Sequence, residues 1–174
     1  MATHTLRGKM TKEHQFEQLV REEFKHLLPT IIWQSDDGCY EVFDRYTIVS
    51  NPQGYKVYIN GDEQGYFHST RTAMSWCIAD KYKQYNLARE LLTIDNILAN
   101  VTNDLHVRVG VANKCKNSQM RENIETKLEP KILQKRTLEY QLNKCVNRAK
   151  YLQQKGFENE TKRFGSATAN KTNR

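Results

Sequence analysis

The stretch Tyr55-Lys56-Val57-Tyr58-Ile59-Asn60-Gly61 decides how the middle of this 174-residue chain folds. Its first five residues have the Tyr, Val and Ile content of a strand on a half-buried sheet surface. The Asn-Gly pair that follows is the strongest short hairpin signal, because both central residues of a type I′ turn need positive φ. We therefore predict a β-hairpin that returns through Gly65-Tyr66-Phe67-His68.

Similar short runs precede this hairpin and predict further strands at Ile31-Ile32-Trp33, Cys39-Tyr40-Glu41-Val42-Phe43 and Arg45-Tyr46-Thr47-Ile48-Val49. The first two runs are separated by the turn Ser35-Asp36-Asp37-Gly38, and Asn51-Pro52-Gln53-Gly54 is a second turn signal. Short strands joined by such turns predict an antiparallel meander.

Two helices are expected to flank the meander. Before it, Thr11 can cap an amphipathic helix of about 17 residues that Pro29 ends. After it, Ser69 or Thr70 can cap a helix that covers one face of the sheet, with Trp76 filling the contact.

The second half of the chain has the apolar spacing of a long helical hairpin. Leu87, Leu91, Ile94, Leu98, Val101 and Leu105 alternate four and three residues apart, and so do Leu138, Leu142, Cys145, Ala149 and Leu152. This is the spacing of a coiled-coil seam. Pro130 predicts a kink or a new helix start, and Gly156 predicts the end of the second helix.

The expected organisation is α+β: a flexible arm at 1–10, a helix–sheet–helix domain at 11–85, the hairpin at 86–156 and a disordered basic tail at 157–174. Residues 114–174 carry 15 Lys and Arg against 6 Asp and Glu, whereas residues 1–113 carry 12 against 14. This asymmetry favours an acidic partner, such as nucleic acid or an acidic protein surface. We find no apolar run long enough for a membrane span and no secretory signal.

Residues with the chemistry of an active site are not grouped in this sequence. Phosphate-loop, dinucleotide, zinc-protease and nucleophile-elbow motifs are missing, the five histidines are scattered, and the four cysteines stand 30 or more residues apart. Isolated cysteines are most often small buried hydrophobes. We therefore predict a binding protein that is not an enzyme and that uses no cofactor, metal or small-molecule substrate.

Two binding hypotheses remain open. In the first, which we favour, the hairpin seams exceed what one hairpin can bury, so that the hairpin and the basic tail contact other protein chains, through Leu98, Val101, Leu105, Leu138 and Leu142. In the second, the basic C-terminal third binds DNA or RNA, through Lys144, Arg148, Lys150, Lys155, Lys162 and Arg163. Acidic residues are interspersed along the second helix, so a solvated surface is the plainer interpretation of its charge.

Several stretches resemble a family of uncharacterised proteins of marine tailed phages, including cyanophages. These are Tyr40-Glu41-Val42-Phe43-Asp44-Arg45-Tyr46-Thr47-Ile48-Val49, Thr72-Ala73-Met74-Ser75-Trp76-Cys77-Ile78-Ala79-Asp80-Lys81-Tyr82, Asn143-Lys144-Cys145-Val146-Asn147-Arg148-Ala149-Lys150-Tyr151 and Gly156-Phe157-Glu158-Asn159-Glu160-Thr161. The family has no assigned activity, so the resemblance implies no functional residues. It implies a phage product that is located in the virion or the host cytoplasm. Together with the two seams and the missing motifs, it predicts a virion structural or assembly component.

Overall fold

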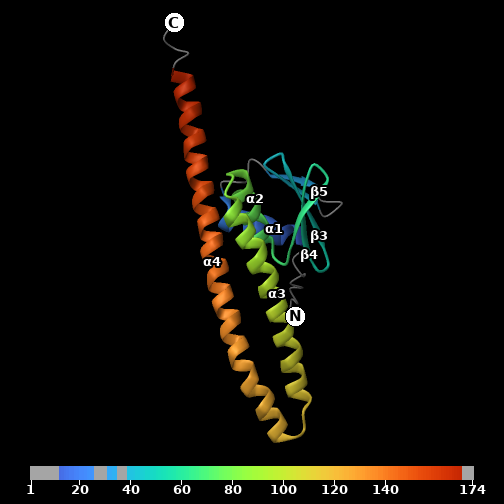
Figure 1. Ribbon diagram of the computed structural model, residues 1–174. Helices are drawn as coiled ribbons and strands as arrows, with labels where there is room; N and C mark the ends of the chain where they lie inside the picture. Colours follow the sequence, from blue (N-terminus) through green and yellow to red (C-terminus); the bar gives the residue numbers. More distant parts are fainter. Residues whose placement is uncertain (1–11, 26–30, 35–38, 170–174) are drawn as a thin grey trace, which may run out of the picture.

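The computed structural model of the chain describes residues 12–25, 31–34 and 39–169, and these form an α+β fold. The elements in order are α1 (Lys12–Glu23), β1 (Ile31–Gln34), β2 (Cys39–Val42), β3 (Tyr46–Asn51), β4 (Gly54–Ile59), β5 (Asp62–Phe67), α2 (Thr70–Lys81), α3 (Tyr85–Lys114) and α4 (Ser118–Ala169). Figure 1 shows α2 between the sheet and α4, with α3 and α4 side by side. The predicted fold class is confirmed. The predicted arm and the turn at 35–38 lie outside the described residues, whereas α1 ends at Glu23, earlier than the predicted stop at Pro29.

The sheet is the predicted meander, in which each of five strands pairs antiparallel with the next. Asn60 and Gly61 have φ of 50° and 85°, as a type I′ turn requires. In the turn between β3 and β4, the Asn51 side-chain oxygen accepts hydrogen bonds from the backbone N–H groups of Gln53 and Gly54, at 3.0 and 2.9 Å.

The turn between β2 and β3 has an unusual backbone, because Phe43 and Asp44 have φ of 57° and 53° without any glycine. Left-handed backbone costs roughly 1–2 kcal/mol for an ordinary L-residue. Packing holds Phe43 in place: the Lys81 ammonium lies 4.0 Å from its ring centroid, and Tyr46 packs against it edge-on.

The core lies between one face of the sheet and α2. The buried strand side chains are Tyr40, Val42, Tyr46, Ile48, Val57 and Phe67. Ser69 is the N-cap of α2, since its hydroxyl accepts a hydrogen bond from the Thr72 N–H at 3.2 Å. Trp76 is only 7% exposed and packs against Tyr46 and Phe67, with ring centroids 6.1 Å apart in both pairs. The predicted role of Trp76 is confirmed.

The hairpin of α3 and α4 turns at 115–117, where the Asn117 side chain accepts hydrogen bonds from the first N–H groups of α4. The α4 helix also completes the main core, to which it contributes the buried residues Cys145, Val146 and Ala149. No described helix is both long enough and apolar enough to cross a membrane.

Two predicted interruptions of the second helix, a new start at Pro130 and an end at Gly156, are wrong. α4 passes through Pro130 without a new start, because Leu128 and Leu138 on either side of the proline pack into one cluster with α3. It also passes through Gly156, which does not have the positive φ of a helix-ending glycine. The predicted disordered tail is therefore helical up to Ala169, and residues 170–174 lie outside the described part of the chain.

Candidate functional site

Three of the five residues predicted to bind a partner protein face the interior of the hairpin. Val101 and Leu105 are 6% and 8% exposed and pack with Leu128, and Leu138 packs against this cluster. The two long helices therefore bury the seam between themselves. A partner could reach Val101 or Leu105 only if the hairpin opened, so any protein-binding surface has to be sought elsewhere.

Leu98 and Leu142, the other two predicted residues, line a pocket of 490 Å³ beside the end of β5. Its lining includes the buried Asp95, which is 4% exposed and accepts hydrogen bonds from the backbone N–H of His68 at 3.0 Å and from His68 Nδ1 at 2.9 Å. Asp95 thereby joins α3 to the sheet. Ser69, which also lines the pocket, is engaged in capping α2, so this site has a structural explanation.

Of the six predicted nucleic-acid residues, five lie on the surface: Lys144, Arg148, Lys155, Lys162 and Arg163. Lys150 does not belong with them. Its ammonium lies 3.0 Å from the Glu23 carboxylate and 5.7 Å from the centroid of the Phe24 ring, and so it holds α1 against α4. Lys150 thus has a packing role that the sequence did not indicate, and its part in a binding surface stays a prediction.

One side of α4 gathers most of these cations together with aromatic rings. We define the outer face of α4 as Leu133, Tyr140, Lys144, Tyr151, Lys155 and Lys162. Their intervals of seven and four residues return to the same side of an α-helix. The packed residues Leu142, Cys145 and Ala149 lie on the opposite side. The outer face thus points away from the rest of the molecule.

The tyrosines of the outer face are exposed and are paired with its lysines. Tyr140 is 64% and Tyr151 54% exposed. The Lys144 ammonium lies 5.2 Å from the centroid of the Tyr140 ring, and the Lys155 ammonium 5.1 Å from that of Tyr151. A hydrogen bond with Tyr151 raises the pKa of Lys155, and the Glu158 carboxylate adds to this shift.

Acidic residues are missing from the same part of α4. Between Glu139 and Glu158 the sequence has no Asp or Glu. Among the described residues, no carboxylate lies within ion-pair distance of Lys144 or Arg148. Nearer the hairpin turn the charges are balanced within the helix, for example between Arg121 and Glu125 at 3.1 Å.

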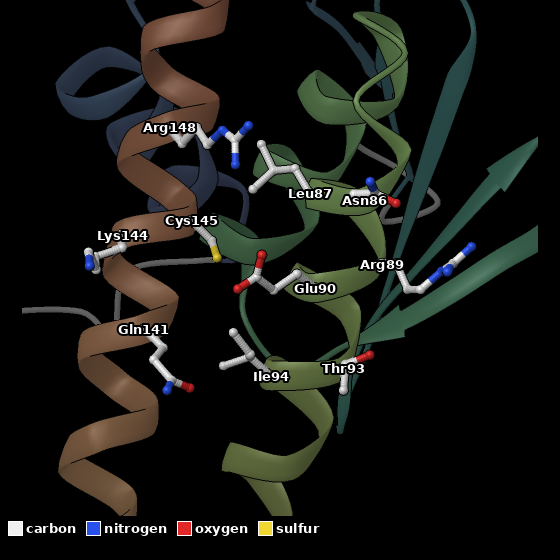
Figure 2. Close-up of a pocket in the computed structure, with 10 residues that line it drawn as sticks. All are labelled: Asn86, Leu87, Arg89, Glu90, Thr93, Ile94, Gln141, Lys144, Cys145 and Arg148. Carbon is white, nitrogen blue, oxygen red and sulfur yellow. The ribbon is translucent and has the colours of Figure 1, made fainter.

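A groove of 620 Å³ lies next to the outer face, between α3 and α4 (Figure 2). Arg148 reaches across it towards α3, whereas Lys144 points away from α3. Glu90 is the one carboxylate in its lining and points towards Cys145. Burial and the neighbouring Glu90 raise the pKa of the Cys145 thiol to about 11. Cys145 is therefore protonated at neutral pH and is a poor nucleophile, while Arg148 extends the cationic surface of α4 to the groove.

Sequence reasoning found the cations but missed the tyrosines, although Tyr140 and Tyr151 stand four residues before Lys144 and Lys155. That spacing was the available signal. The groove and the Asp95–His68 contact had no signal in the sequence, because their residues are distant along the chain.

Comparisons of the chain with protein-family models, with curated proteins and with solved structures find no match. The phage context implied by the resemblance thus stays a prediction.

Proposed function

We propose that the protein is a non-enzymatic binding protein that holds nucleic acid along the outer face of α4. The observation that carries the proposal is the combination on one exposed surface of Lys144, Arg148 and Lys155 with two tyrosines and no carboxylate from 140 to 157. Phosphates attract cations that are not already neutralised, and exposed aromatic rings offer surfaces on which bases can stack.

A surface that serves only solubility would mix both signs of charge, as other parts of this helix do. Arg121 and Lys135 each have a carboxylate four residues further along, in Glu125 and Glu139. Between residues 140 and 157 the only charged side chains of α4 are cations, and the two exposed tyrosines lie in this stretch, which ends at Glu158 beside Lys155. This coincidence favours a polyanionic ligand with aromatic groups over a solvated helix.

The test is a fluorescence-anisotropy titration of labelled DNA with the wild-type protein and the double variant Lys144→Gln, Arg148→Gln at several salt concentrations. We expect wild-type affinity to fall steeply with salt. The variant should bind about tenfold more weakly, with a salt slope lower by about 1.4 for single strands or about 1.8 for duplex, since two phosphate contacts are lost.

The matched control is Lys114→Gln, Lys116→Gln, which removes the same charge from exposed positions at the hairpin turn. It should change affinity by less than about twofold, because few phosphates reach that end of the molecule. Equal losses of DNA affinity in the two double variants would mean that binding depends on the net charge of the protein and not on the outer face of α4. Absence of wild-type binding even at low salt would contradict the proposal.

A second candidate is assembly with another copy of this chain through the end of the hairpin. Val107 and Val111 lie one turn apart on α3 and are 55% and 53% exposed, and Figure 1 shows this end of the hairpin projecting past the sheet. Charges of both signs flank them, as in the Arg108–Asp104 pair. A contact between identical patches needs such self-complementarity. This hypothesis keeps the predicted assembly role but moves it from the seam to other residues.

A further inference from the structure

The length of the outer face restricts which form of nucleic acid can follow it. From Tyr140 to Lys162 the face extends for about 33 Å at 1.5 Å per residue. One strand of B-DNA winds once around the duplex in about 34 Å, so it stays on one side of the duplex for only about half that distance. A straight helix would therefore meet one strand of a duplex, then a groove and then the other strand, whereas a flexible single strand could place its phosphates and bases along the whole face.

The tyrosines restrict the ligand further. In each Tyr–Lys pair the lysine lies over one side of the ring, with the ammonium 5.2 Å from the Tyr140 centroid and 5.1 Å from the Tyr151 centroid. More than half of each tyrosine remains exposed, so a flat group can stack on it while the lysine beside it meets a phosphate. Bases offer their flat surfaces in a single strand but hide them in a duplex.

The two pairs repeat the same arrangement along α4. Tyr151 and Lys155 follow Tyr140 and Lys144 by eleven residues, which is three helical turns and about 16 Å. This is a distance that a single strand can span within a site of about 4–16 nucleotides. An acidic polypeptide would satisfy the lysines but would leave the tyrosine rings without a stacking partner.

We infer that the ligand is single-stranded nucleic acid, with bases stacked on Tyr140 and Tyr151 and phosphates held by Lys144, Arg148 and Lys155. This inference rests on the proposed function and specifies the class of ligand for the same surface. It predicts that removing the two tyrosines weakens the binding of single strands and leaves the binding of duplex DNA unchanged.

The experiment compares an oligo(dT) of about 15 nucleotides with a duplex of equal length, each titrated with wild-type protein and with Tyr140→Leu, Tyr151→Leu. Leucine preserves helix propensity and removes the stacking surface. We expect wild-type protein to prefer oligo(dT) by at least about tenfold, and the double variant to lose most of that preference. The single variant Tyr85→Leu is the control, since Tyr85 is 59% exposed but lies on α3. It should bind oligo(dT) as wild type does.

Each outcome bears on one proposal or both. Equal or tighter binding of the duplex would overturn the single-strand inference and leave nucleic-acid binding in place. Unchanged oligo(dT) affinity in Tyr140→Leu, Tyr151→Leu would also overturn it, provided that circular dichroism shows the variant to be folded. Competition by polyglutamate as effective as that by oligo(dT) would refute both proposals in favour of a general polyanion surface. Failure of wild-type protein to bind either DNA would refute both as well.

Discussion

Gly156 is a glycine inside a helix whose role is to make room for a neighbour. A Cβ atom at this position would collide with the ring and hydroxyl of Tyr82, which follows α2. Gly110, in the interior of α3, offers a direct comparison, because a Cβ atom there would meet nothing within 4 Å. The same substitution should therefore have opposite effects at the two sites.

We predict that Gly156→Ala destabilises the protein by about 1–3 kcal/mol through overpacking against Tyr82. Gly110→Ala should stabilise it by about 0.5–1 kcal/mol, because alanine restricts the unfolded chain and favours the helix. Urea denaturation of both variants measures the two free energies. A stabilised Gly156→Ala would show that α4 does not pack against Tyr82 as described.

Individual residues also show where sequence reasoning stopped. Lys144 and Arg148 could be identified from their offset from the apolar seam, since helical periodicity fixes the side of the helix on which a residue lies. Lys150 could not be sorted from them, because its partner Glu23 comes from a helix at the other end of the chain. The positive φ of Phe43 could not be predicted either. Phe43 is not a typical turn residue, and its contact with Lys81 comes from a helix much later in the chain.

At the scale of elements, Glu23 ties α1 to two other helices. Its carboxylate lies 2.9 Å from Arg71 Nε in α2 and 3.0 Å from Lys150 Nζ in α4. Partial burial alone would raise the pKa of Glu23, but the hydrogen bonds from Lys150 and Arg71 outweigh it and lower the pKa below its ordinary value of 4.5. A carboxyl group whose pKa is lower in the folded state stabilises that state above its unfolded pKa.

We predict that Glu23→Gln lowers the free energy of unfolding by about 1 kcal/mol at neutral pH, a modest value because solvent screens this partly exposed site. The difference from wild type should shrink as the pH falls below 4.5, where the wild-type carboxyl group also becomes protonated. Urea denaturation at pH 7 and at about pH 3 tests this. Glu22→Gln is the control, because Glu22 is exposed and contacts Gln18 within its own helix. A pH-independent effect of Glu23→Gln would argue against the ion pairs.

The elements themselves were largely predictable, but their ends were not. Strand composition, the Asn60-Gly61 turn and three-four spacing are local signals, and they located the meander, α2 and both long helices. The continuation of α4 through Pro130 and Gly156 depends on tertiary contacts, with α3 in one case and with Tyr82 in the other. Local propensity gave the opposite expectation at both positions because it contains no such contacts.

At the scale of the whole molecule, assembly through the hairpin end is tested by light scattering after size-exclusion chromatography. We expect wild-type protein to form dimers as its concentration rises, and Val107→Asp, Val111→Asp to remain monomeric, because a dimer would bury unpaired carboxylates. The control Asn113→Asp, Ser118→Asp adds the same charge at exposed polar positions near the turn. A wild-type protein that stays monomeric at every concentration would exclude this assembly.

The contribution of α4 to the main core also sets the order in which the protein can fold during synthesis. A nascent chain emerges with its N-terminus first, so the sheet and α2 leave the ribosome well before Cys145, Val146 and Ala149, which complete their core. Until those residues are made, one side of α2 has no covering helix. The protein therefore reaches its native core only after most of its sequence has been translated, and chaperones would meet it chiefly in that interval.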